Sequence, residues 1–192
     1  MSKVSWNDRR GSRRDILVHT LARLRVTLGF LSGAIVLALA HPTRRSLVIG
    51  LGVAAAGEAI RVWAAGHLNK AREVTTSGPY RWVPHPLYVG SSVMGAGLAI
   101  AAASVPVAAL IAVYLAVTLT AAIKSEEAFL RRTFGDQYDL YRAGQLAKRA
   151  ASARRPPRRF SAAQAIANRE HRAIIGFLIA ALLLVLKATF AS

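Results

Sequence analysis

The chain has 192 residues, of which 54% are hydrophobic, yet its formal net charge is +17. A soluble domain of this length would spread its charge over its whole surface, whereas here long apolar stretches alternate with short segments crowded with Arg and Lys. The chain has no Cys, which excludes disulfides, a thiolate nucleophile and cysteine-based metal sites. Its five His residues are scattered, so we expect no metal site.

Five apolar stretches follow one another along the chain, at residues 26–40, 46–66, 87–103, 105–123 and 173–190. A helix needs roughly 20 apolar residues to cross a bilayer core about 30 Å thick. The stretches therefore predict an all-α integral membrane protein with about five transmembrane helices, although two of them are shorter than this length. The alternative is a soluble helical bundle, but the last stretch has no charge before Lys187 and would be hard to bury in so small a protein.

Basic residues crowd residues 1–25, 67–86 and 126–172, whereas the other connections carry only Arg44 and Arg45 or no charge. Cytoplasmic loops of membrane proteins are enriched in Lys and Arg. We therefore expect the N-terminus and both long loops to lie in the cytoplasm, and the protein to reside in the inner (cytoplasmic) membrane. The segments expected are a basic N-terminus (1–25), two transmembrane helices (26–66), a central core (67–145), a second basic segment (146–171) and a last transmembrane helix (172–192).

The third and fourth apolar stretches are separated only by Ser104-Val105-Pro106. Pro is tolerated in the first turn of a helix, so these residues predict the turn of a tight helical hairpin over about residues 88–124. The helix before this turn is unusually rich in small residues, namely Gly90, Ser91, Ser92, Gly95, Ala96 and Gly97. Small side chains let helix backbones approach closely in lipid, which favours a role in packing.

Residues 142–159 carry seven Arg and Lys residues and no acid. Nucleic-acid binding is one interpretation of such a run. On the cytoplasmic side of a membrane protein, attraction to anionic lipid headgroups explains it better, at about 1 kcal/mol per basic residue. We expect anionic membrane lipid as the partner of this segment, and no nucleic acid.

The second apolar stretch contains two ionisable residues, Glu58 and Arg61, followed by Trp63. Glu58 and Arg61 are three positions apart and share a helix face. Ionisable groups at membrane depth are costly and usually face a cavity or the bundle interior, so the three residues are candidates for substrate binding. The alternative is that Arg61 extends toward the membrane surface while Trp63 anchors the interface.

Residues 75–90 combine three prolines, two glycines and three aromatic residues directly before a predicted membrane helix. Pro fixes φ and removes N–H donors, so such a segment is rigid and leaves carbonyl groups available to a ligand. Irregular backbone at a membrane face is tolerated where it lines a cavity. His85 lies between Pro84 and Pro86, which a stiff linker alone does not explain.

Two adjacent carboxylates, Glu126 and Glu127, follow the fourth apolar stretch. Neighbouring residues on a helix point about 100° apart, so we expect different surroundings for the two. Glu127 has Lys124 three positions before it and Arg131 four positions after it, which predicts ordinary surface pairs. Glu126 lies on the apolar stripe with no charged residue at helical distance, and is expected to be either neutral or paired with a cation.

The last two clusters resemble the isoprenylcysteine carboxyl methyltransferase family and its relatives, the phospholipid N-methyltransferases. The matching residues are Gly78-Pro79-Tyr80, His85-Pro86-Leu87-Tyr88-Val89-Gly90, Glu126-Glu127 with Leu130, and Phe134-Gly135 with Tyr138 and Tyr141. Arg61-Val62-Trp63-Ala64 is similar to the family's upstream helix. The match covers roughly residues 51–141. The order and spacing of several motifs make it specific for the superfamily and much less so for the substrate.

The resemblance implies S-adenosylmethionine as the cofactor, in a pocket facing the cytoplasm within the core at 67–145. The residues it assigns to the cofactor are Gly78, Pro79, Tyr80, His85, Pro86, Tyr88, Gly90 and Glu126. Glu126 and His85 are the catalytic candidates, because an amine or hydroxyl acceptor needs a base. Two family arginines are replaced, by Pro84 and Ala122. The second is thought to hold a substrate carboxylate, so its loss weakens the prenylcysteine interpretation.

The sequence therefore predicts methyl transfer to a lipid or another lipophilic small molecule at the membrane. One alternative is carboxyl methylation of a prenylated cysteine. Another is a non-catalytic membrane scaffold or transporter that retains the fold. Binding of S-adenosylmethionine in detergent separates the enzymes from the scaffold.

Overall fold

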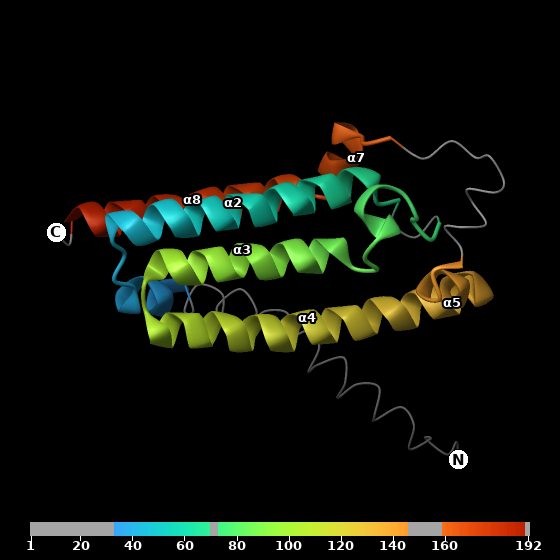
Figure 1. The fold of residues 1–192 in the computed structure, drawn as a ribbon, viewed down its shortest axis with the longest axis horizontal. Coiled ribbons are helices and arrows are strands. Elements are labelled where there is room, and N and C mark those ends of the chain that lie inside the picture. The colour runs from blue at the N-terminus through green and yellow to red at the C-terminus, as the bar shows by residue number, and fades with distance from the viewer. Residues whose placement is uncertain (1–32, 70–72, 146–158, 191–192) are drawn as a thin grey trace, which may run out of the picture. The chain divides into compact units, whose positions relative to one another are not determined.

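The structure is a computed structural model that describes residues 33–69, 73–145 and 159–190, and the regular structure in these ranges is entirely helical (Figure 1). Two compact units divide the chain, residues 1–39 and residues 40–192. In the first unit only a helix over residues 33–39 is described. The predicted stretch 26–40 thus lies partly outside the described residues, and the account below concerns the second unit.

The second unit contains α2 (Arg44–His67), the short 3-10 helix η1 (Gly78–Arg81), α3 (Pro86–Ala102), α4 (Val105–Phe134), α5 (Asp136–Arg142), α7 (Ala162–Ala167) and α8 (Glu170–Phe190). Local signals set several of these bounds. Before α2, the Ser46 amide donates to the Thr43 hydroxyl at 3.1 Å and the Thr43 amide donates to the Ser46 hydroxyl at 2.9 Å. After α4, Gly135 adopts φ 49°, which ends the helix.

Three helices, α2, α4 and α8, are long and apolar enough to cross a membrane. This confirms the predicted all-α membrane class. At 17 residues, α3 is apolar but shorter, and the predicted count of five crossings also depends on residues 26–40. The helix α4 extends well past the predicted bound at 123, because no Gly or Pro interrupts it before Gly135. The carboxylates Glu126 and Glu127 therefore lie on a continuation of the apolar helix.

The predicted hairpin is confirmed. The helix α3 ends at Ala102, Ala103 takes a left-handed conformation with φ 48°, and α4 begins at Val105 with Pro106 in its first turn. The two helices run side by side from this turn (Figure 1). A tight turn of this kind places the part of α4 around Glu126 near the start of α3.

Small residues bring α2 and α3 into backbone contact. A Cβ at Gly57 would lie 2.3 Å from the Met94 amide nitrogen, and one at Gly97 would lie 2.3 Å from the Ala54 amide nitrogen. Real Cβ atoms do not approach backbone this closely, so the two helices pack together only because these positions are Gly. The predicted packing role of the small residues in α3 is confirmed.

The segment after residue 158 packs against the end of α2. The Ser161 amide donates to the Gly66 carbonyl at 3.1 Å, and the Asn168 side chain donates to the carbonyls of Ala65 and Leu68, both at 2.8 Å. The Phe160 ring covers the position of a Cβ at Gly66. The end of α2, the segment around η1 and the start of α8 therefore gather at one end of the unit.

Candidate functional site

The segment that carries His85 is held in an irregular shape by Gly and Pro. Gly78 has φ 57°, and a Cβ there would lie 2.6 Å from the His67 ring. Pro79 lies in the first turn of η1 and Pro86 in the first turn of α3, where their missing N–H groups leave no helical bond unmade. His85 is the residue that caps α3, with φ −130° and ψ 61°. Its ring is thereby directed from a loop toward the neighbouring helix α4.

His85 lies between the two adjacent carboxylates of α4. Its Nδ1 is 3.8 Å from Glu126 Oε2, and its Nε2 is 3.4 Å from Glu127 Oε1. The His85 side chain is 14% exposed, that of Glu127 is 18% exposed and that of Glu126 is 35% exposed. Each ring nitrogen faces a different carboxylate. One imidazole therefore contacts both Glu126 and Glu127, although their side chains leave the helix in different directions.

The prediction that Glu127 forms surface pairs with Lys124 and Arg131 is wrong. Glu127 contacts His85 and Arg142, and Arg131 pairs instead with Asp139 at 3.5 Å. The physical reason is the turn at Gly135, after which α5 packs against α4 and presents Arg142 to Glu127. Pairs along an exposed helix face are worth only about 0.3–0.5 kcal/mol, and this tertiary contact replaces them.

The carboxylates change the protonation of His85. Partial burial lowers the pKa of the His85 imidazole, but the hydrogen bonds and charges of Glu126 and Glu127 outweigh it and raise this pKa above its ordinary value. The imidazole therefore keeps its proton to higher pH than a free histidine does. The two carboxylates thus stabilise the protonated form of His85.

Aromatic side chains enclose the same region. Tyr138 of α5 is fully buried and Tyr80 is 7% exposed, and burial raises the pKa of Tyr80, so its phenol stays neutral. The Tyr141 hydroxyl donates to the Tyr80 carbonyl at 3.0 Å. This bond ties α5 to η1, and so holds the predicted Gly-Pro-Tyr segment beside the carboxylate pair.

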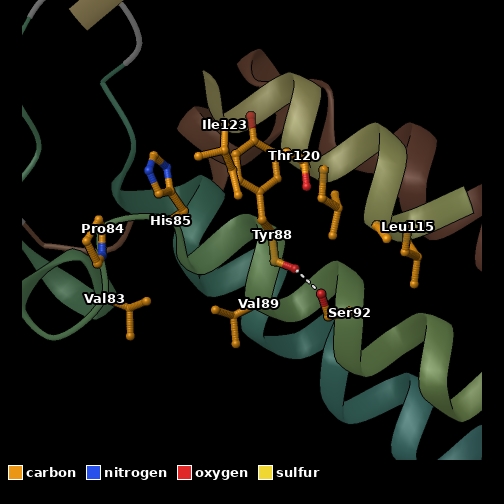
Figure 2. Close-up of a pocket in the computed structure, with 11 residues that line it drawn as sticks. Val83, Pro84, His85, Tyr88, Val89, Ser92, Leu115, Thr120 and Ile123 are labelled. Carbon is orange, nitrogen blue, oxygen red and sulfur yellow. Dashed lines mark hydrogen bonds between the residues drawn. The ribbon is translucent and has the colours of Figure 1, made fainter. Parts of the chain in front are cut away.

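A cavity of about 350 Å³ lies beside this cluster, between α3 and α4 (Figure 2). His85 and Pro84 lie at one end, and the Tyr88 ring points toward Ile123 and Thr120 of α4. The remaining wall is largely aliphatic and includes Val89, Leu115 and Leu119. A polar, charged end thus adjoins an apolar chamber.

The residues assigned to the cofactor divide into two groups. His85 and Tyr88 line the cavity, and Glu126 contacts His85. The others support the backbone: Gly78 contacts His67, Pro79, Tyr80 and Pro86 are buried, and Gly90 lies against Gly57 and Arg61 of α2. The first group is therefore the one placed to touch a ligand.

The predicted substrate residues lie close together on α2: Glu58 and Trp63 both line a second cavity, of about 520 Å³, and Arg61 pairs with Glu58. Arg61 pairs with Glu58 at 3.4 Å, as expected from their spacing, and also with Glu170 of α8 at 2.8 Å and with the Ser91 hydroxyl. Trp63 is 39% exposed and its ring lies 5.8 Å from that of Trp82. Arg61 is therefore enclosed by buried partners, whereas Trp63 belongs to a half-exposed aromatic pair.

Two residues of these clusters were not anticipated from the sequence. Glu170 is 109 positions from Arg61 and lies next to a basic run, so no local pattern indicates it. Arg142 was placed in the basic segment 142–159, whereas the structure pairs it with Glu127. Residues 146–158 of that segment lie outside the described part of the chain.

The fold and this site define the chain as an integral membrane protein of apolar helices, with a cluster of charged residues where the start of α3 meets α4. The model of the phospholipid methyltransferase family matches residues 33–137, more than half of the chain. The chain therefore belongs to the phospholipid methyltransferase family. The match includes the hairpin α3–α4, His85 and both carboxylates.

Two curated proteins are similar to part of the chain. The nickel-cobalt-cadmium resistance protein NccN of Alcaligenes xylosoxydans xylosoxydans is 35% identical over 96 residues, which are 49% of this chain and 43% of that protein. The cobalt-zinc-cadmium resistance protein CzcN of Cupriavidus metallidurans is 34% identical over 89 residues, 45% of this chain and 40% of that protein. The matches thus span less than half the length of these relatives. No solved structure matches the chain.

Proposed function

We propose that this protein transfers a methyl group from S-adenosylmethionine to a lipid or another lipophilic small molecule at the membrane. The observation that carries the proposal is the position of His85 between Glu126 and Glu127, at the end of an apolar cavity formed by α3 and α4. In a member of the phospholipid methyltransferase family, this arrangement joins the two expected requirements, a charged end for the cofactor and an apolar chamber for the acceptor.

The residues present fit the proposed cofactor. S-adenosylmethionine supplies a methyl group bound to a positively charged sulfur and also carries an ammonium group. Glu126 and Glu127 would hold these positive groups, and Tyr88 and His85 offer flat rings against which the adenine could lie. The Glu126 side chain is 35% exposed and that of Glu127 is 18% exposed, so Glu126 is the carboxylate that we assign to the cofactor.

The chain's own residues also suit the acceptor. An aliphatic wall on α3 and α4 would hold an apolar body and exclude water, which strengthens electrostatic contacts at the charged end. An amine or hydroxyl acceptor must lose a proton, and Glu126 and His85 are the two candidates for the base at the charged end of the cavity. We take the more exposed carboxylate, Glu126, as the base, with His85 holding it in place.

Cofactor binding by the purified full chain in detergent is the direct test. His85→Ala should weaken binding of labelled S-adenosylmethionine at least tenfold, about 1.4 kcal/mol, the scale of a hydrogen bond to a charged group. The control is His171→Ala, an exposed residue at the start of α8, which should bind as the parent does. Equal cofactor binding by both variants would show that His85 is not part of the cofactor site.

The acceptor requires a separate assay. Labelled methyl groups should appear in a total membrane lipid extract and not in a prenylated cysteine peptide, since Ala122 stands where a carboxylate-binding arginine would be. Transfer to the peptide alone would favour the carboxyl methyltransferase alternative.

A second candidate function follows from the names of the relatives, which are heavy-metal resistance proteins. In that case the chain contributes to metal tolerance, either through a methylated product or as a non-catalytic scaffold. A test of metal tolerance distinguishes the methylated product from the scaffold. A deletion strain is grown with nickel, cobalt and cadmium, and either the parent gene or the Glu126→Gln gene is returned to it. Full restoration by Glu126→Gln would favour the scaffold.

A further inference from the structure

Arg61 of α2 joins its own helix to both α3 and α8. Its Nε lies 2.8 Å from Glu170 Oε1 of α8, and its Nη1 group donates to the Ser91 hydroxyl of α3. Its aliphatic stem lies against the backbone of α3, because a Cβ at Gly90 would be only 2.6 Å from Arg61 Cγ. One side chain thus connects α8 to the first part of α3.

The Ser91 hydroxyl continues this connection toward the start of α3. It donates to the Leu87 carbonyl at 2.9 Å, and Leu87 directly precedes Tyr88. His85, which caps α3, makes no capping hydrogen bond with its side chain. A helix start without such a bond is less firmly held. The contact between Arg61 and Ser91 therefore supports the turn that carries two residues of the candidate site.

Glu170 sets the direction of the Arg61 side chain. Its carboxylate is 5% exposed and takes the Arg61 Nε group at 2.8 Å, whereas Glu58, one turn earlier on α2, lies 3.4 Å from the same nitrogen. A buried guanidinium settles where its donors find partners. With Glu170 in place, Nη1 is directed to Ser91. Without it, Glu58 would remain as the carboxylate partner and would draw the guanidinium along α2.

We propose that Glu170 is a positioning residue for the cofactor site, an inference that rests on the proposed function. Glu170 holds Arg61 against Ser91. The start of α3, which carries His85 and Tyr88, is thereby held beside α4. Glu170 lies outside residues 33–137, which the family model matches, so this contact is not part of the family match. The helix α8, predicted only as a membrane crossing, would then also shape the site.

NMR titration of the His85 ring in the full chain, in detergent and without cofactor, reports the position of the start of α3. The raised pKa of His85 depends on its closeness to Glu126 and Glu127. Glu170→Ala should lower the midpoint by about 0.3 unit or more, toward the ordinary value of about 6.5. Glu170→Gln loses the same charge but keeps an oxygen that accepts from Arg61, so it should keep the parental midpoint. The pair separates positioning from loss of charge.

Ser91→Ala breaks the connection on its other side without changing any charge, and should lower the midpoint as Glu170→Ala does. Because both substitutions interrupt one path, the double variant should titrate no lower than the lower single variant. Thr118→Ala is the matched control. Its hydroxyl also donates to the carbonyl four residues earlier, that of Tyr114, but it lies on α4 away from Arg61. This variant should titrate as the parent does.

Cofactor binding by the same proteins connects the inference to the proposed function. Ser91→Ala and Glu170→Ala should raise the Kd of labelled S-adenosylmethionine about threefold to tenfold, the scale of one hydrogen bond, and Glu170→Gln should bind as the parent does. A parent that binds no cofactor would overturn the proposed function, and the titration alone would then decide whether Glu170 positions His85.

Four results would overturn the inference. They are equal midpoints for Glu170→Ala and Glu170→Gln, a parental midpoint for Ser91→Ala, additive shifts in the double variant, and parental cofactor binding by Ser91→Ala when the parent binds. Ser91→Ala leaves every charged partner in place, so it decides the question even if Glu170→Ala fails to fold.

Discussion

At the scale of single residues, the site beside α4 is a chain of alternating charges. Glu126 and Glu127 flank His85, and Arg142 holds Glu127 from the other side. The two carboxylates thus have different tasks. Glu127 contacts both His85 and Arg142, and we propose that the more exposed Glu126 meets the ligand.

Replacing Glu126 by Gln should lower methyl transfer by about tenfold to a hundredfold, because a charge-assisted contact in a dry site is worth about 1.5–3 kcal/mol. The assay is transfer from labelled cofactor to a membrane lipid extract. Glu73→Gln is the matched control and should keep the parental rate, since Glu73 is exposed on the loop before η1. A parental rate for Glu126→Gln in folded protein would remove this residue from the mechanism.

The raised pKa of His85 predicts a specific dependence on pH. A histidine whose pKa is higher in the folded state stabilises the protein below its unfolded pKa of about 6.5, and this contribution is lost as pH rises through the folded pKa. NMR titration of the His85 ring in detergent should give a midpoint above about 6.5. Glu127→Gln should move the midpoint down, because it removes one of the two anionic partners. A parental midpoint at or below the ordinary value would contradict the arrangement.

At the scale of elements, the most extensive contact among the described helices is between α2 and α3. This contact fixes the start of α3, where His85 and Tyr88 lie, relative to α2. The α4 helix is joined to α3 by the short turn at Ala103 and Ser104. The geometry of the cavity between α3 and α4 thus depends on how closely α3 packs against α2.

Gly57→Ala should destabilise the protein by about 1–3 kcal/mol, the usual cost of overpacking, because its Cβ would lie 2.3 Å from backbone of α3. Gly52 of the same helix has no atom within 4 Å of its Cβ position. Gly52→Ala should therefore be neutral or stabilise by up to about 1 kcal/mol through helix propensity. Unfolding in mixed detergent micelles measures both, and equal effects would mean that α2 and α3 are not in backbone contact.

At the scale of the whole molecule, the charged loops gather at one end of the second unit. The Arg-containing loop before α3, the end of α4 with α5, and the start of α8 are joined by contacts such as Tyr141 to Tyr80 and Asn168 to Leu68. We propose that this end faces the cytoplasm, as the distribution of Arg and Lys predicts. Attraction of the basic segment 142–159 to anionic lipid remains part of that proposal.

The absence of native Cys allows this orientation to be tested with single substitutions. Val105→Cys at the hairpin turn, where Val105 is 83% exposed, should react with an impermeant maleimide in intact cells. Asp136→Cys, at the exposed start of α5, should react only after the membrane is permeabilised. Equal labelling of the two in intact cells would mean that the hairpin does not cross the membrane.

Local features of the sequence were enough to predict the fold class and to select the candidate residues of the site. Apolar stretches long enough for a bilayer predicted α2, α4 and α8, and Ser104 with Pro106 predicted the hairpin, because these features depend on local composition and local backbone restrictions. His85 and the Glu pair were identified from a rigid proline-rich segment and from motif spacing.

The partner of each charged residue depends on how the helices pack, which local spacing does not predict. Local spacing paired Glu127 with Lys124 and Arg131, but the turn at Gly135 brings Arg142 to it instead. Arg61 likewise shares its charge with Glu170, from the far end of the chain. The physical reason is that a pair along one exposed helix gains little in water, whereas a buried charge must find a partner on whichever element packs against it.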